Sequence, residues 1–212
     1  LGPVVGYKVA YASKAAQEQF GISAPASGPF FLIQHVPNGS TIPAGEFNAV
    51  IFETEVAFTI GERIAEPIDG LEALEKRVRS VHAAFDIGNN RYDASAGKPT
   101  VADQVANGVG AHRFIIGPAM NPSEIDVDGL TLRLAVGDET VAESPATEVL
   151  GSPWKSLQWL ANQVTARGET LEPGYVILTG TAAPAYRAKG QEMKAKYVGD
   201  CGPLGVVHCE IK

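Results

Sequence analysis

Cysteine is scarce in this chain, and so are tryptophan and methionine: the 212 residues include two of each. Two cysteines, Cys201 and Cys209, are too few for the dense disulfide framework that stabilises small secreted domains. We therefore expect a protein of a reducing compartment, with a cytoplasmic location as the default.

Long apolar runs and excess positive charge are also lacking. No apolar run reaches the roughly 18 residues that a membrane-spanning helix needs. Acidic residues outnumber basic ones by 24 to 17, which gives a formal net charge of −7 and a pI of about 5.1. The basic residues form no stripe of the kind that binds nucleic acid. These absences argue against a membrane or nucleic-acid partner, while the 45% hydrophobic content is sufficient for a packed core.

No repeat, low-complexity segment or long linker interrupts the sequence, so we expect a single domain over residues 1–212. The first residue, Leu1, is not a methionine, and a strand-like run follows almost at once. No signal peptide is visible. We expect either that an N-terminal stretch has been removed or that these residues are part of a longer chain.

Most of the predicted elements are strands. Runs rich in β-branched and aromatic residues predict strands at 4–11, 30–36, 49–60, 113–117, 130–136, 175–180, 192–198 and 204–211. Gly137 and Asp138 form a turn signal after one of these runs. Residues 88–100 are expected to form a loop. The pattern predicts a β-rich α+β domain with a largely antiparallel or mixed sheet.

Three segments carry helix signals. Residues 13–21 end at Gly21, and residues 151–169 have a capping residue in Ser152 and a terminating Gly168. Between them, residues 70–85 place apolar side chains at helical spacing, which predicts a further helix. The stripe of this middle segment consists of Leu71, Leu74, Val78, Val81 and Phe85.

Two glutamates interrupt the strongest strand signal, in the stretch FETEVAF at residues 52–58. Because side chains alternate along a strand, Glu53 and Glu55 project from the same face, about 6.5 to 7 Å apart along the strand. Two ionised carboxylates repel one another in a poorly solvated place, and a hard cation such as Mg²⁺, Mn²⁺ or Ca²⁺ removes the repulsion. The alternative interpretation is a solvated outer face.

Asp86 and Lys8 add to this hypothesis, because each lies among apolar residues. An acid bracketed by Phe85 and Ile87 needs a partner if it is buried. A lysine in the run VVGYKVAY can be desolvated, which lowers its pKa toward neutrality. The alternatives are an exposed loop acid or cap for Asp86 and an outward-facing lysine for Lys8.

Four segments together resemble the fumarylacetoacetate hydrolase-like superfamily, over nearly the whole chain. They are GYKVAYASKAAQEQFGI (6–22), FETEVAF (52–58), VHAAFDIGNNR (81–91) and the long block VLGSPWKSLQWLANQVTARGETLEPGYVILTG (149–180). The last match is long and specific, whereas the Glu-x-Glu pattern alone is not. The branch that the chain resembles contains the 2-oxopent-4-enoate hydratases and the 4-oxalocrotonate decarboxylases of aromatic meta-cleavage pathways.

This resemblance implies a roll or barrel-like mixed sheet with a few flanking helices. It also implies that Glu53, Glu55 and Asp86 bind Mg²⁺ or Mn²⁺, that Lys8 is catalytic and contacts substrate, and that Thr179 and Gly180 line a substrate carboxylate pocket. Homo-oligomers and association with a partner enzyme of the pathway are further implications. The family's N-terminal helical segment is absent from residues 1–212.

The chain departs from the family pattern at several positions. Ala26 stands where an aspartate with a proton-transfer role is usual, Ser152 where a histidine is common, and Gln191 where an aspartate is common. Residues 105–114 match the family only loosely. These differences indicate a divergent member.

The resemblance leaves three functions open. The leading hypothesis is a metal-dependent lyase, either a hydratase or a decarboxylase, that acts on a small unsaturated 2-oxo or 2-hydroxydienoate acid. The second is an acylpyruvate-type C–C hydrolase, which Asp86 and the missing acid at Ala26 favour. The third is a non-catalytic partner subunit, against which the presence of the three carboxylates and Lys8 argues. Product analysis separates the first two, and a metal titration tests the third.

Overall fold

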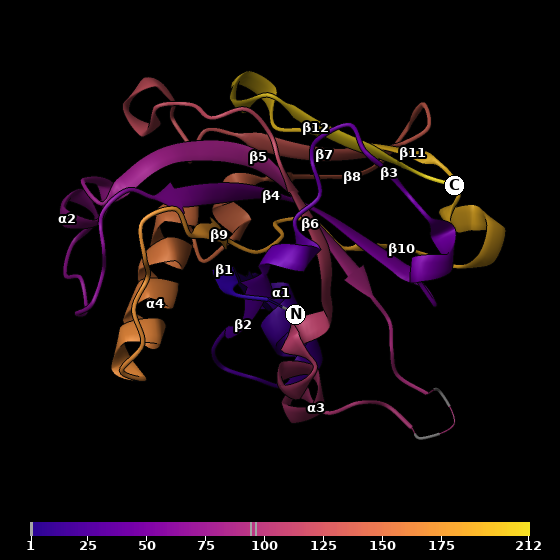
Figure 1. Cartoon of the computed structure of the whole chain (residues 1–212), viewed down its shortest axis with the longest axis horizontal. Coiled ribbons are helices and arrows are strands. Elements are labelled where there is room, and N and C mark those ends of the chain that lie inside the picture. Colours follow the sequence, from indigo (N-terminus) through magenta and orange to yellow (C-terminus); the bar gives the residue numbers. More distant parts are fainter. Residues whose placement is uncertain (1, 94, 96) are drawn as a thin grey trace.

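Two β-sheets form the body of the molecule in the computed structural model, which describes residues 2–93, 95 and 97–212 (Figure 1). The first sheet has seven strands and the second has five. The first contains β1 (Val4–Ala10), β2 (Ala26–Phe31), β4 (Val50–Ile60), β5 (Val78–Asn89), β6 (Ala111–Ile116), β9 (Val176–Leu178) and β10 (Tyr186–Ala188). The second contains β3 (Thr41–Ile42), β7 (Thr131–Val136), β8 (Glu139–Pro145), β11 (Lys196–Asp200) and β12 (Val206–Ile211).

The helices are short apart from one. They are α1 (Lys14–Phe20), α2 (Leu71–Glu75), α3 (Val101–Ala106) and α4 (Pro153–Ala166), and a 3₁₀ turn, η4, covers Gly108–Gly110. None of the helices in the described parts of the chain has the length and apolar character to cross a membrane. The mixed sheets and few helices confirm the predicted fold class.

The first sheet is mixed and curls on itself. Its strand order is β2-β1-β9-β4-β5-β6, with β10 beside β4, and only the β1–β9 pairing is parallel among the pairings found between its described strands. At the far edges, the backbone that follows β2 reaches β6: the N–H of Val36 donates to the carbonyl of Phe114 at 3.0 Å. This contact joins the two edges and gives the sheet an inner face.

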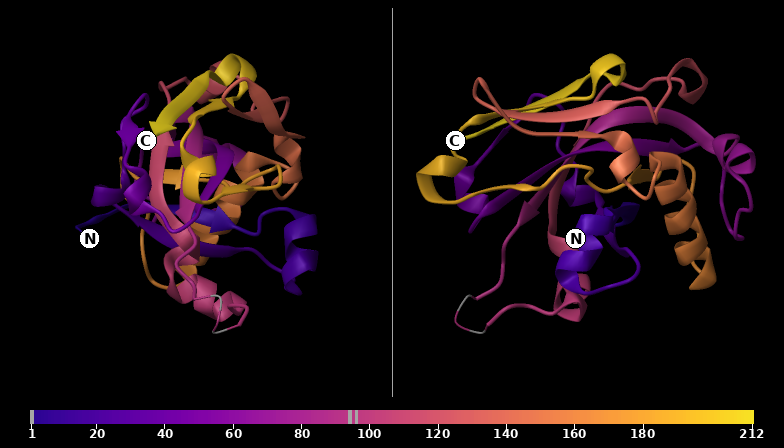
Figure 2. Two further views of the ribbon diagram at one scale, coloured as in Figure 1. Left: turned by 90° about the vertical axis from the view of Figure 1, so that its right-hand side faces the viewer. Right: turned by 180° about the vertical axis from the view of Figure 1, so that it is seen from behind.

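A first hydrophobic core fills the space between the two sheets, which Figure 2 shows lying one across the other. The ring of Phe52 on β4 stacks on that of Tyr197 on β11, with centroids 3.8 Å apart, and Phe85 on β5 meets Phe52 edge-on at 5.1 Å. All three side chains are fully buried. Aromatic contacts of this kind fix how the second sheet sits on β4 and β5.

A second apolar cluster lines the inner face of the curled sheet. It consists of Phe30, Ala57, Ala84, Ala111, Phe114, Val176 and Leu178. The alanines on the two central strands are small, so they leave room above them for longer polar side chains on the same face. The inner face is where Glu53, Glu55 and Asp86 project.

Helix α4 confirms the prediction for residues 151–169. The hydroxyl of Ser152 accepts a hydrogen bond from the Trp154 N–H at 3.1 Å, which caps the first turn, and the helix ends before Gly168. Its apolar side is buried, and the ring of Trp154 packs 4.3 Å from Phe58 on β4. Helix α1 likewise confirms the segment 13–21, with Ser13 as its cap and Gly21 in the left-handed conformation.

The predicted helix over residues 70–85 is wrong. Only Leu71–Glu75 are helical, and β5 begins at Val78. Val81, Phe85 and their neighbours fit a helical stripe, but Val81, Ala83, Phe85 and Ile87 also alternate as a strand requires. Pairing with both β4 and β6 decides the outcome, because a central strand buried on both faces need not alternate in polarity.

Other boundaries differ in smaller ways. The predicted strand at 30–36 turns into a 3₁₀ helix at Leu32–Gln34, and that at 192–198 begins only at Lys196. Helix α3 and strands β8 and β10 were not predicted, although Thr100 and Asp103 form a capping box at the start of α3. The loop predicted over 88–100 contains Ala94 and Ala96, which lie outside the described residues.

The packing of β11 on β5 makes a stability prediction. A Cβ atom at Gly199 would lie 2.6 Å from Cε1 of Phe85 and 3.0 Å from Oγ1 of Thr54. We expect Gly199→Ala to lower the free energy of unfolding by about 1–3 kcal/mol, because the crowded core must shift. Urea unfolding measures the change. Gly45→Ala is the control, since nothing lies within 4 Å of its Cβ position. Equal midpoints for the two variants would contradict the packing described.

Candidate metal centre

The pairing of β4 with β5 brings three carboxylates together. Glu53 lies directly opposite Asp86 in the antiparallel register, and Glu55 follows two residues along β4 on the same inner face. One carboxylate oxygen from each residue lies within 4.8 Å of the others. The structure therefore brings together the three acids predicted as metal ligands. The register of β4 against β5 is sufficient to place them side by side.

Lys8 enters this group from a different strand. It lies on β1, opposite Leu178 of β9, and its side chain is almost completely buried. Its ammonium forms a short ion pair with the Oδ2 of Asp86 and lies 3.4 Å from the carbonyl oxygen of Val109. Two strands, β9 and β4, separate β1 from β5 in the sheet, so only the curl of the sheet allows this contact.

Glu55 is held by the backbone that follows β9. The N–H of Gly180 donates to Oε2 of Glu55 at 2.7 Å, and both groups are buried. Gly180 has a φ of +98°, and a Cβ at this position would lie 2.5 Å from the Cβ of Ala12. Glycine is therefore required here for two reasons: the backbone has a positive φ, and a side chain would collide with Ala12.

Thr179 is fully buried beside this contact. Its hydroxyl donates to the carbonyl of Val56 at 2.9 Å, and its own carbonyl accepts from the hydroxyl of Ser156 at 2.6 Å. The hydroxyl and carbonyl of Thr179 and the N–H of Gly180 thus form hydrogen bonds within the protein, and these bonds fix the backbone next to Glu55. Their contact with substrate stays a prediction.

Two carboxylate oxygens at this centre lack a partner among the described residues. Oε1 of Glu55 and Oδ1 of Asp86 are buried and accept no hydrogen bond. An unpaired buried oxygen of this kind is costly. Burial raises the pKa of Glu55 to about 8, and the neighbouring carboxylate of Glu53 adds to the rise, whereas Lys8 and the Gly180 N–H oppose it.

The donor set fits a hard divalent cation. Three carboxylates and two unused buried oxygens supply the ligand type that Mg²⁺ and Mn²⁺ prefer. A cation among them would satisfy the unpaired oxygens and remove the repulsion between Glu53 and Glu55. The residues present therefore match the metal that the sequence predicts.

The turn η4, which sequence reasoning missed, covers one side of the centre. Val109 adopts a positive φ of 48° between two glycines, and its carbonyl faces the ammonium of Lys8. On β2, a Cβ at Gly28 would lie 2.9 Å from Cγ2 of Val109, so the absence of a side chain there lets the turn approach. The signal in the sequence is the glycine pair Gly108 and Gly110.

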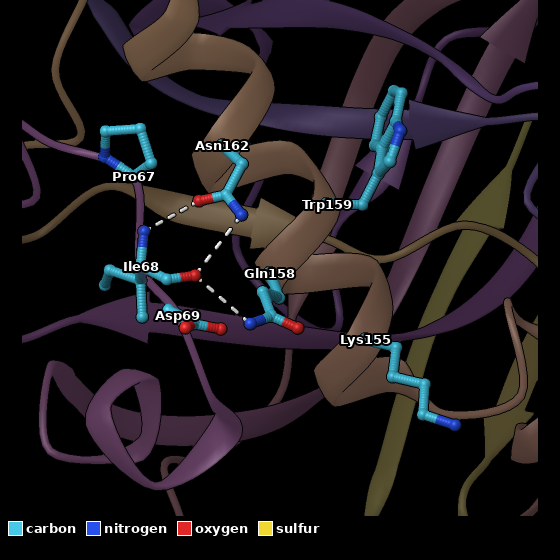
Figure 3. Close-up of a pocket in the computed structure, with 7 residues that line it drawn as sticks. All are labelled: Pro67, Ile68, Asp69, Lys155, Gln158, Trp159 and Asn162. Atoms are coloured by element: carbon cyan, nitrogen blue, oxygen red, sulfur yellow. Dashed lines mark hydrogen bonds between the residues drawn. The ribbon is translucent and has the colours of Figure 1, made fainter.

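A separate surface pocket of about 360 Å³ lies beside α4 (Figure 3), and none of the residues that line it belongs to the carboxylate centre. The side-chain amides of Gln158 and Asn162 point toward the backbone of Ile68 and bond to it, at 2.8 to 3.3 Å. These amides fasten the segment before α2 to α4. None of the residues that line this pocket has a buried polar side-chain atom without a partner, in contrast to the carboxylate centre.

Comparison with known proteins identifies relatives over most of the chain. The family model described as fumarylacetoacetate (FAA) hydrolase C-terminal matches residues 4–207. 2-Keto-4-pentenoate hydratase 1 of Dechloromonas aromatica (strain RCB) is 30% identical over 189 residues, which are 88% of this chain and 70% of the relative. A 4-oxalocrotonate decarboxylase of Pseudomonas sp. is 29% identical over 181 residues, covering 85% and 69% of the two chains.

Solved structures share the fold. The 4-oxalocrotonate decarboxylase from Pseudomonas putida G7, complexed with magnesium and adipate, superimposes with a TM-score of 0.91 at 24% identity, over 99% of this chain and 78% of that one. The same enzyme complexed with calcium and acetate gives a TM-score of 0.89 at 23% identity, with the same coverage. These matches extend over both sheets and all the strands that carry the carboxylates and Lys8.

The contact between Gly180 and Glu55 predicts an effect on metal binding. We expect Gly180→Ala to weaken Mn²⁺ binding at least about tenfold, because the new methyl displaces the N–H that orients the carboxylate. Gly174→Ala is the matched control: Gly174 also has a positive φ, of 92°, but nothing lies within 4 Å of its Cβ position. Calorimetric titration of both folded variants measures the difference. Equal loss of affinity in the two would contradict the assigned role.

The raised pKa of Glu55 predicts how metal binding depends on pH. Without a cation, Glu55 holds a proton below about pH 8, and Mn²⁺ must displace it. The apparent affinity therefore rises as pH rises, by roughly tenfold per unit at most, and levels off above about pH 8. Titrations in buffers of different ionisation enthalpy also report the released proton. An affinity that stays constant between neutral pH and pH 8 would exclude this coupling.

Proposed function

Because the chain belongs to the fumarylacetoacetate hydrolase C-terminal family, we propose that it is a divalent-metal-dependent lyase, a hydratase or a decarboxylase, of aromatic catabolism. Its substrate is a small unsaturated 2-oxo or 2-hydroxydienoate acid. The observation that carries the proposal is the convergence of Glu53, Glu55 and Asp86 beside Lys8, with two buried carboxylate oxygens unpaired.

The relatives support this assignment. Their names include 2-keto-4-pentenoate hydratases, 4-oxalocrotonate decarboxylases and, in Escherichia coli, a 2-oxo-hept-4-ene-1,7-dioate hydratase. All three names describe lyases that act on unsaturated 2-oxo acids. The magnesium and calcium complexes of a structural neighbour support a hard divalent cation, and we propose Mg²⁺ or Mn²⁺ for this chain.

Glu53, Glu55 and Asp86 would hold that cation. When bound, the cation would act as a Lewis acid that polarises the 2-oxo group of the substrate and stabilises negative charge on its oxygen. Gly180 keeps Glu55 directed at this point through its N–H. The apolar cluster below, with Phe30 and Leu178, excludes water from the inner end of the site.

Lys8 is the group that moves protons. Its Nζ lies beside Asp86 on the inner face, next to where a substrate bound at the carboxylates would lie. From this position it can deliver a proton to the substrate carbon skeleton and take one back, which is what both hydration and decarboxylation of such acids require. Ala26 provides no acid for this purpose, so the proton transfer rests on Lys8.

A turnover assay tests the function in three forms of the protein: loaded with metal, treated with a chelator, and carrying Lys8→Met. We expect turnover of 2-hydroxypenta-2,4-dienoate or a related acid with Mg²⁺ or Mn²⁺ and none after metal removal with a chelator. Lys8→Met should lower kcat by about 10²–10⁴-fold while Mn²⁺ still binds. The control is Lys14→Met, which removes an exposed lysine of α1.

Product analysis then separates the reactions. Hydration gives one hydroxy-oxo acid, decarboxylation releases CO₂, and C–C hydrolysis yields two acids. Failure of every such acid to turn over in the metal-loaded protein would refute the proposal, and absence of specific metal binding would point to the non-catalytic alternative.

We further propose a homo-oligomer in the cytoplasm, with a pathway enzyme as a second partner; light scattering and co-purification test these points.

A further inference from the structure

Arg187, on strand β10, lies on the same face of the sheet as the carboxylates of the metal centre. It lies directly opposite Ile51 in the antiparallel pairing of β10 with β4, so the two side chains share a face. Ile51 and Glu53 lie two residues apart on β4 and share that face too. Tyr186, the residue before Arg187, lies on the opposite face, with its ring 6.2 Å from that of Tyr197 in the core. Arg187 therefore shares the inner face with the carboxylates.

The strand next to β4 is interrupted at the level of the carboxylates. Strand β9 pairs with residues 57–59 of β4, and β10 pairs with residues 50–52. Between them, Thr179 still donates to the carbonyl of Val56, and the chain from Gly180 to Ala185 then leaves the ladder beside Glu53 and Glu55. Arg187 is the second paired residue after this break, so it lies close to the point where the ladder stops.

Other cations near the centre are already engaged. Lys8 is paired with Asp86, and Arg91 donates to the carbonyls of Asn107 and Ala111, which fastens the turn η4. Arg187 is exposed, and it forms no hydrogen bond or ion pair with any residue in the described parts of the chain. A guanidinium of this kind is available to bind a carboxylate bidentately.

The spacing suits a second carboxylate on the substrate. Diagonal neighbours on paired strands, such as Arg187 and Glu53, lie about 7–8 Å apart, with their Cβ atoms somewhat closer. The carbon skeleton of an extended six-carbon diacid spans roughly 6 Å, because each of its five bonds of about 1.5 Å advances the zigzag chain by only about 1.25 Å. A 2-oxo acid held at Glu53, Glu55 and Asp86 would therefore carry its far end to within reach of the flexible Arg187 side chain.

Tyr11 lies near both ends of this path. Its hydroxyl donates to Oε1 of Gln104 at 2.6 Å, and its backbone holds a positive φ of 57°. Burial raises the pKa of Tyr11 to about 12; the nearby Tyr92 and the carboxylate of Glu53 add to the rise, and the guanidinium of Arg187 opposes it. The Tyr11 hydroxyl is thus close enough to sense the charges of both Glu53 and Arg187.

We propose that Arg187 binds the distal carboxylate of the substrate, so that this protein prefers 2-oxo dicarboxylic acids of six or seven carbons over the corresponding monoacids. The inference rests on the proposed function, because the 2-oxo end must be held at the metal centre. Arg187 is then a specificity-determining residue that contacts the substrate at a point remote from the reacting bonds.

Binding of two matched acids tests this without requiring turnover. 2-Oxoadipate and 2-oxohexanoate have the same six-carbon chain and differ in the distal carboxylate. With the Mn²⁺-loaded protein, we expect calorimetry to show 2-oxoadipate binding about 10- to 100-fold more tightly, the range for a hydrogen bond between charged groups. Arg187→Gln should abolish this difference and leave the affinity for 2-oxohexanoate and for Mn²⁺ unchanged.

Arg79→Gln is the matched control, because Arg79 is also an exposed strand arginine of the same sheet, near the far end of β5. It should keep the full preference for 2-oxoadipate. Equal binding of both acids by the unmodified protein would overturn the role of Arg187 and leave the metal-dependent function standing. A parallel loss of both acids and Mn²⁺ in Arg187→Gln would overturn it as well, because Arg187 would then only balance the charge of Glu53. Binding of neither acid by the unmodified, metal-loaded protein would overturn the proposed function together with the inference.

Discussion

Repulsion between buried carboxylates is the constraint around which this molecule is organised. Glu55 and Asp86 are fully buried, Glu53 lies within a few ångströms of both, and among the described residues the ammonium of Lys8 alone is paired with the group. If all three acids were ionised, they and one buried cation would leave an excess of negative charge that water cannot screen, and for that reason burial raises the pKa of Glu55 to about 8. A divalent cation would balance the charge of these carboxylates, and we therefore expect the folded protein to bind one here.

The curled sheet supplies the conditions for that arrangement. The β4–β5 register aligns the acids, the curl brings Lys8 of β1 across to β5, and the backbone after β9 leaves the ladder so that Gly180 can orient Glu55. The second sheet holds the opposite face of β4 and β5 through Phe52, Phe85 and Tyr197. Each strand pair therefore has a direct consequence for the position of an oxygen or an ammonium at the centre.

Much of this could be predicted from the sequence, and the part that could not has a physical cause. Alternation along residues 49–60 correctly places Glu53 and Glu55 on one face, and the caps at Ser13 and Ser152 correctly mark two helices. The segment 70–85 fails because apolar residues at short range fit both a helix and a fully buried strand, and only long-range pairing decides. The closeness of Asp86 to Glu53 depends on that same pairing, so the resemblance to a family, and not periodicity, identified it.

Some residues matter because they have no side chain or because of their position in the fold. The sequence alone does not identify them. Gly28 and the glycines of η4 act by leaving space, and Arg187 becomes notable only once β10 is seen beside β4. The resemblance gave Thr179 and Gly180 a role toward substrate, whereas in the structure their hydrogen-bonding groups face Val56, Ser156 and Glu55. Backbone hydrogen bonds of this kind are difficult to predict from a single sequence.

The central claim is that one hard cation binds where the three carboxylates meet. Crystals of the protein soaked with Mn²⁺ and oxalate, measured near the manganese absorption edge, test it most directly. We expect one strong anomalous peak bounded by oxygens of Glu53, Glu55 and Asp86, with oxalate bound to the same ion next to Lys8. A map with no peak among these three residues, or with manganese bound only elsewhere on the surface, would contradict it.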